Sequence, residues 1–152
     1  MAKRCTDSVR IDYHATMTLQ NMSERFTYIG SAYLFLINDK EEILLQRRSN
    51  TGFEDGNYGV PSGHLDGNET ARQGCAREIK EEIGIDLKTE DLEIVHVMHR
   101  KAKEDERIDF FITAKSYSGQ IKNLEPDKCD DLRWFKLSDL PANMVDYVRE
   151  AL

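Results

Sequence analysis

Three glutamates have a spacing that would let their carboxylates bind one divalent metal ion together. Glu78, Glu81 and Glu82 lie in the segment AREIKEEIG, where about 100° of helical rotation per residue would gather them within about 100° of one another. Like charges so placed destabilise a helix by roughly 0.2–0.5 kcal/mol per pair, whereas Mg²⁺ would attract all three carboxylates. The backbone carbonyls of Ser62 and Gly63 could add oxygen ligands. From spacing alone, a solvated face of an amphipathic helix is the alternative.

The helix that would carry these carboxylates has recognisable ends. Thr70 and Gln73 have the spacing of a capping box, and Gly84 is suited to the left-handed residue that ends many helices. Ile79 and Ile83 share a neighbouring face that can be buried. We therefore expect a helix from about residue 71 to residue 83, with one side in the core and the acidic strip beside it.

The segment 63–85 resembles the Nudix box, G-x5-E-x7-R-E-U-x-E-E-x-G-U, in which U is aliphatic. Every fixed position is filled, by Gly63, Glu69, Arg77, Glu78, Ile79, Glu81, Glu82, Gly84 and Ile85. The resemblance implies a hydrolase that cleaves a nucleoside diphosphate linked to another moiety X, using Mg²⁺ or Mn²⁺. It also implies an α/β fold, the Nudix α/β/α sandwich with a mixed β-sheet.

The resemblance assigns roles inside and beyond the box. It places Arg77, Glu78, Glu81 and Glu82 in the catalytic set, with Glu78 as the first candidate for the general base. Spacing also allows Arg77 a structural role, paired with Glu81 or Glu69. The expected metal ligands are Ser62, Gly63, Glu78, Glu81, Glu82 and, from the acidic segment 122–131, Glu125. Asp127 and Asp130 are rivals to Glu125, and a solvated acidic loop is the alternative.

Four residues outside the box are expected to bind the substrate. Arg47 and Arg48 end the expected strand 42–47, and the resemblance implies that one of them faces the phosphates. Phe53 is the large apolar residue of the turn-rich loop 49–57, where it could stack on a base or pack against the protein. Asn143 follows Pro-Ala and could read a purine edge, as in similar enzymes, or cap the expected helix 144–152.

Substrate markers known from other members of the family are missing. About fifteen residues beyond the box, members that act on ADP-ribose tend to carry a Pro and members that act on diadenosine polyphosphates a Tyr, and this chain has neither residue there. The SQPWPFPxS array of NADH-cleaving members is also absent. The resemblance then favours a (deoxy)nucleoside triphosphate, oxidised or not, cleaved to a monophosphate and pyrophosphate. The alternatives are a non-catalytic nucleotide-binding module, or a diphosphatase for a nucleotide sugar or an isoprenoid diphosphate.

Composition limits the partners of the chain. With 39% hydrophobic and 32% charged residues and a net charge of −7, we expect no nucleic-acid polymer and no membrane as partner. Cys5, Cys75 and Cys129 form neither a CxxC pair nor an even set, which favours a reducing cytoplasm without disulfides.

We expect two regions along the chain. Residues 1–26 form an N-terminal extension, in which the alternation from Val9 to Leu19 suggests an edge strand, a homodimer arm or a poorly ordered arm. Residues 27–152 form the Nudix domain. Its expected strands are 28–37 and 42–47, paired as a hairpin, followed by 58–61, 92–99, 108–114 and 132–137.

Overall fold

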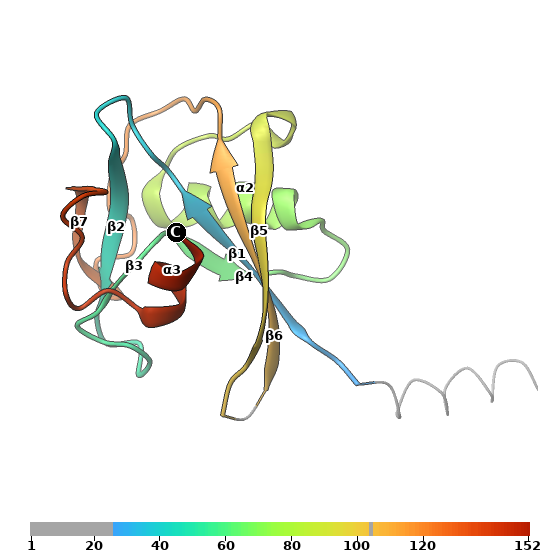
Figure 1. Cartoon of the computed structure of the whole chain (residues 1–152). Helices are drawn as coiled ribbons and strands as arrows, with labels where there is room; N and C mark the ends of the chain where they lie inside the picture. Colours follow the sequence, from blue (N-terminus) through green and yellow to red (C-terminus); the bar gives the residue numbers. More distant parts are fainter. Residues whose placement is uncertain (1–25, 104) are drawn as a thin grey trace, which may run out of the picture.

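Two β-sheets and two α-helices form the described part of the chain, residues 26–103 and 105–152 of a computed structural model (Figure 1). The strand or arm expected from Val9 to Leu19, in the extension 1–26, lies outside these residues. The strands are β1 (Ile29–Phe35), β2 (Glu42–Arg48), β3 (Tyr58–Gly59), β4 (Ser62–His64), β5 (Leu92–Lys101), β6 (Glu106–Ala114) and β7 (Cys129–Lys136). The helices are α2 (Ala71–Ile83), the 3₁₀ turn η1 (Thr89–Asp91) and α3 (Asp146–Ala151).

The larger sheet is mixed and has the strand order β4-β1-β6-β5. Strands β1 and β6 pair in parallel, whereas β1–β4 and β5–β6 pair antiparallel. The run from Ala32 to Leu36 is buried on both faces, as expected for a central strand whose two sides are both covered. The smaller sheet, of order β3-β2-β7, is antiparallel.

The expected hairpin of β1 and β2 is wrong, because the two strands belong to different sheets. A short antiparallel contact remains next to the turn, where Ile37 bridges Ile43. There the Leu44 amide donates to the Leu36 carbonyl, and the Asn38 amide donates to the Glu42 carbonyl. Strand β2 pairs along its length with β7, almost ninety residues later in the chain. Alternation within a segment identifies a strand but not its partner.

Helix α2 matches its expected bounds. The Thr70 side chain accepts from the Gln73 amide, and the Gln73 side chain accepts in return from the Thr70 amide. Gly84 ends the helix at φ 77°, a conformation that glycine adopts without strain. Ile79 and Ile83 are fully buried and pack in the core beside β1, so the adjoining face is left to the carboxylates.

Helix α3 is shorter than expected. It begins at Asp146 rather than at residue 144, its N-cap is Val145, and no side chain caps it, so the cap expected of Asn143 is wrong. Val148 anchors the helix in the second core cluster, together with Tyr33 and Phe111. The mixed sheet thus lies between α2 on one face and α3 on the other (Figure 1), which confirms the expected α/β class.

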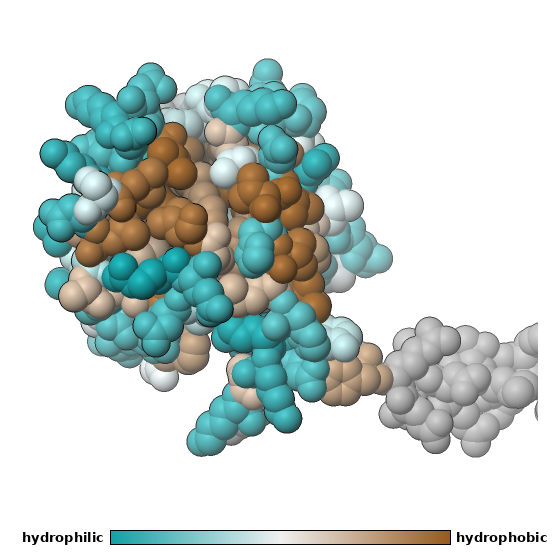
Figure 2. Space-filling view, in the orientation of Figure 1, coloured by the Kyte–Doolittle hydropathy of each residue, from teal (hydrophilic) through white to brown (hydrophobic). Residues whose placement is uncertain are grey.

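The described residues leave apolar side chains exposed on β5, the edge strand of the mixed sheet. Ile94, Val95 and Val97 of β5 are 37–50% exposed, and apolar atoms gather along this side of the molecule in Figure 2. None of the described helices is long and apolar enough to cross a membrane.

Candidate active site

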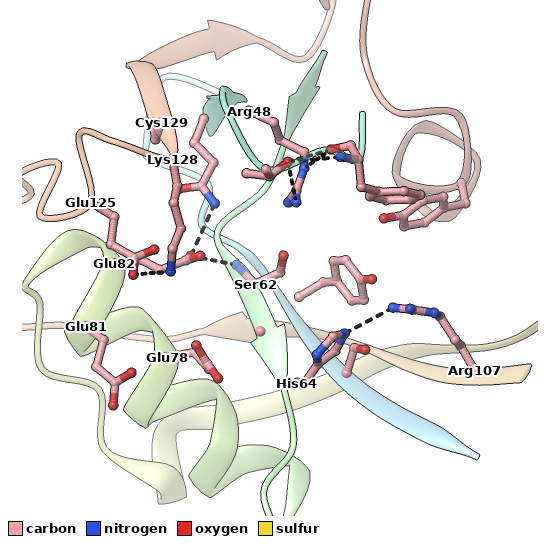
Figure 3. A pocket seen from close by; sticks show the side chains of 17 residues that line it. Arg48, Ser62, His64, Glu78, Glu81, Glu82, Arg107, Glu125, Lys128 and Cys129 are labelled. Carbon is pink, nitrogen blue, oxygen red and sulfur yellow. Dashed lines mark hydrogen bonds and ion pairs between the residues drawn. The ribbon is translucent and has the colours of Figure 1, made fainter. Parts of the chain in front are cut away.

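A cavity of about 430 Å³ lies between the two sheets, beside the acidic face of α2 (Figure 3). Its lining comes from the helices α2 and α3, from the strands β1, β2, β4, β6 and β7, and from the loops before β3 and β7. The carboxylates of Glu78, Glu81, Glu82 and Glu125 gather at one end, and His64 and Arg107 lie toward the other (Figure 3). The cavity therefore has an acidic end and an end richer in cationic and aromatic groups.

Glu82 is the most deeply set of these carboxylates. Its Oε2 accepts from the Ser62 amide at 2.9 Å and from the Gln46 side chain at 3.2 Å. Burial nonetheless dominates and raises the pKa of Glu82 to about 8, because the two neutral donors compensate only in part for lost solvation. A carboxylate held in this way would gain strongly from a cation placed beside it.

Glu78 lies against the backbone of Gly63. A Cβ atom at position 63 would stand 2.0 Å from the Glu78 carboxyl carbon, so only glycine fits beneath this carboxylate. Arg77 donates to Glu78 at 2.7 Å and also to Glu69 and to the His64 carbonyl. The pKa of Arg77 is accordingly raised, chiefly by the bonds to Glu69 and Glu78.

Arg77 therefore braces the loop before α2 while it neutralises Glu78. Its distance to Glu81 is longer, at 3.8 Å, and the Glu81 side chain is 58% exposed. Of the two structural partners expected for Arg77, Glu69 makes the closer contact.

Glu125 reaches the cavity from the loop before β7 and pairs there with Lys128 at 2.7 Å. Among the described residues, no three acidic, histidine or cysteine side chains are grouped closely enough to hold a metal ion as they stand. Two of the carboxylates are paired with cations instead, Glu78 with Arg77 and Glu125 with Lys128. Asp130 pairs with Arg47 away from the cavity, and Asp127 does not line it either.

The two neighbouring arginines of β2 point to different surroundings, as alternation along a strand requires. Arg48 lines the cavity and donates to the Phe53 carbonyl and to Thr51. Arg47 instead forms a bidentate pair with Asp130 and does not line the cavity. Phe53 lines the cavity at 48% exposure, with the Arg48 guanidinium 5.6 Å from its ring centre.

Asn143 does not line the cavity. Its side-chain amide donates to the Gly56 carbonyl at 2.7 Å, and its backbone carbonyl accepts from the Tyr58 amide. These bonds tie the end of the loop 49–57 to the segment before α3. The base-reading role of Asn143 stays a prediction.

Several cavity residues were not singled out from the sequence. Arg107 of β6 donates to Nε2 of His64, so the His64 proton must reside on Nδ1 while this bond holds, because a guanidinium only donates. Alternation along β1 could have indicated Ser31 and Tyr33, which share one face of the strand. Lys128 and Tyr147 carried no sequence signal, since they approach the cavity only through the fold.

Aromatic side chains form much of the cavity away from the carboxylates. Tyr33 and Tyr147 line it, with ring centres 5.9 Å apart in an edge-to-face arrangement. Burial, followed by the neighbouring Tyr147, raises the pKa of Tyr33, so this phenol stays neutral. Neutral rings beside His64 and Arg107 suit a planar ligand group more than they suit a phosphate.

Comparisons with known proteins agree with this geometry. The family model described as NUDIX domain matches residues 27–152. A MutT NUDIX hydrolase from Burkholderia pseudomallei is similar in structure, with a TM-score of 0.75 and 29% identity over 82% of this chain and 95% of that one.

Two curated relatives are similar in sequence. A putative 8-oxo-dGTP diphosphatase of Bacillus subtilis is 28% identical over 78% of this chain and 73% of its own length. An NAD-capped RNA hydrolase NudC of Stutzerimonas stutzeri is 24% identical over 78% of this chain. The chain spans 41% of the length of that NudC relative.

Proposed function

The chain belongs to the Nudix family, and we propose that it hydrolyses a (deoxy)nucleoside triphosphate, oxidised or not, to a monophosphate and pyrophosphate with Mg²⁺. The observation that carries this proposal is the uneven distribution of side chains in the cavity, with four carboxylates at one end and aromatic residues at the other. The first end suits a metal-bound polyphosphate, and the second suits a base.

The donor set fits a hard divalent ion. Glu78, Glu81, Glu82 and Glu125 supply carboxylate oxygens around one cavity, and the absence of a side chain at Gly63 leaves room for the Glu78 carboxyl group. The raised pKa of Glu82 reports a carboxylate without enough positive charge nearby. We propose these four residues as ligands, with the backbone carbonyls of Ser62 and Gly63 as further donors. Mn²⁺ would suit the same oxygens.

Mg²⁺ at this place would neutralise the phosphates and lower the pKa of a water molecule that attacks phosphorus. For Glu78 and Glu125 to act as ligands, Arg77 and Lys128 must release part of their hold on these carboxylates. The two cations would remain close enough to balance the charge of the carboxylates and of an arriving phosphate chain.

The protein residues would do three things in the reaction. A glutamate of the acidic end, with Glu78 as first candidate, accepts the proton of the attacking water. Arg48, which lines the cavity from β2, stabilises charge that develops on the phosphates. Phe53 offers a face on which the base can stack.

A substrate screen tests the proposal. We expect purified protein with Mg²⁺ to release pyrophosphate from at least one nucleoside triphosphate faster than it cleaves ADP-ribose, NADH or diadenosine tetraphosphate. Phosphate and pyrophosphate should be measured separately, because a monophosphatase would release only the former. A clear preference for one of the three comparison substrates would overturn the substrate assignment while leaving the family membership intact.

A further inference from the structure

Arg100 and Asp109 form a buried ion pair beneath the aromatic end of the cavity, and neither residue lines the cavity. Arg100 of β5 donates through Nε to Asp109 of β6 at 2.8 Å. The Asp109 side chain is 0% exposed and that of Arg100 is 17% exposed, so both charges are largely removed from water. Asp109 lies between the apolar residues Ile108 and Phe110 of β6.

The pair is poorly explained by stability alone. Asp109 Oδ1 and Arg100 Nη2 are buried and have no hydrogen-bond partner among the described residues. Replacing a buried ion pair by packed apolar side chains is often neutral or stabilising, because desolvation of the charges offsets their attraction. An incompletely bonded pair at this position therefore calls for another contribution.

That contribution is visible on the other side of the Arg100 guanidinium. Its Cζ lies 3.8 Å from the centre of the Tyr147 ring, the shortest cation–π contact among the described residues. Tyr147 belongs to α3, a helix of six residues with no side-chain cap, so the orientation of its ring depends on the side chains that contact it, Arg100 and Tyr33. Asp109 holds the guanidinium, and the guanidinium holds the ring.

We infer that Arg100 is a positioning residue for substrate recognition, which fixes the Tyr147 ring as a wall for the base of the nucleotide. This inference rests on the proposed function, because it assigns the aromatic end of the cavity to the base. Base stacking requires a ring held in one plane, and a ring free to rotate would lose that contact. Arg100 makes no contact with the carboxylate end, so its effect is confined to binding of the base.

Arg100→Lys distinguishes the effect of the positive charge of Arg100 from the effect of its planar guanidinium group. Lysine keeps a positive charge for Asp109 but loses the planar group that stacks on Tyr147. We expect KM for the preferred nucleoside triphosphate to rise about fivefold or more, with kcat changed less than about twofold. Inhibition by the nucleoside monophosphate product should weaken by a similar factor, and inhibition by pyrophosphate, which has no base, should not change.

Arg133→Lys is the matched control. Arg133 also pairs with an aspartate, Asp131, and lies 4.7 Å from the ring centre of Phe135, but neither Arg133 nor Phe135 lines the cavity. The same substitution there should leave KM and both inhibition constants unchanged. Thermal melts of both variants would show whether each is folded at the assay temperature.

A double-mutant cycle with Tyr147→Leu decides whether Arg100 acts through the ring. In the Tyr147→Leu background, Arg100→Lys should have no further effect on KM, because the ring it positions is gone. Additive effects of the two substitutions, or equal weakening of monophosphate and pyrophosphate inhibition, would overturn the inference.

Monophosphate binding can also be followed without turnover, as the shift in melting temperature that the nucleotide causes in the presence of Mg²⁺. If no nucleoside triphosphate is hydrolysed, the proposed function fails. A monophosphate-induced shift that is smaller in Arg100→Lys than in Arg133→Lys would still support the inference, and equal shifts would contradict it.

Discussion

At the scale of single residues, Gly63 and Glu78 show how the backbone and a carboxylate share one space. The Glu78 carboxyl group occupies the volume where any other residue at position 63 would place its Cβ atom. The acidic end therefore depends on a missing side chain as much as on the side chains that are present. Arg77, which bonds Glu78, Glu69 and the His64 carbonyl, joins this contact to the loop before α2.

Gly63→Ala should displace Glu78 and reduce kcat by about 10²-fold, as expected when one well-placed electrostatic contact is lost. Gly67→Ala is the matched control, because a Cβ atom at position 67 would meet nothing within 4 Å. Steady-state turnover of both variants, corrected for the folded fraction from thermal melts, checks this expectation. Equal turnover in the two alanine variants would show that the Glu78 position does not matter for the reaction.

At the scale of elements, the loop 49–57 and the segment before α3 hold each other. Asn143 bonds Gly56 through its side chain, and backbone bonds link Tyr58 with Asn143 and Val145. The loop presents Phe53 to the cavity from one side and α3 presents Tyr147 from the other. Movement of either element would change both aromatic surfaces.

Asn143→Ala tests which role its side chain has. From the observed bond to Gly56 we expect stability to fall by about 1 kcal/mol, with relative rates among the four bases unchanged. Urea denaturation and a comparison of nucleoside triphosphates measure the two effects. A change of about tenfold or more in base preference would instead establish the base-reading role.

The sequence predicted local elements better than long-range pairing. Helix α2 was predicted closely because its caps, apolar face and acidic strip are all encoded within about fifteen residues. The pairing of β2 with β7 could not be predicted, because nothing within a single strand indicates which of the two sheets it joins. The length of α3 was overestimated, because the helix begins at Asp146, after Val145 as N-cap, rather than at residue 144.

At the scale of the whole molecule, two sheets bring distant segments around one cavity. The box residues were expected from their motif, and Arg48, Phe53 and Glu125 were also found to line the cavity. Lys128, Arg107 and Tyr147 could not be expected, because only folding brings three separate segments to the same space. A net charge of −7 would repel a polyphosphate, so the local cations and a bound metal must offset that field.

We propose that the carboxylates of α2 hold the metal used in hydrolysis, and kcat of Glu78→Gln and Glu82→Gln at saturating Mg²⁺ measures this directly. We predict a loss of about 10²–10³ in each variant, while Glu93→Gln, on the exposed strand β5, keeps wild-type turnover. Metal-free stability should hold or rise in Glu82→Gln, because burial disfavours the charged carboxylate at this position. Glu78→Gln should lose stability, because it weakens the ion pair with Arg77. Mg²⁺ should stabilise the wild type more than either variant. Near wild-type turnover in both variants would contradict the claim.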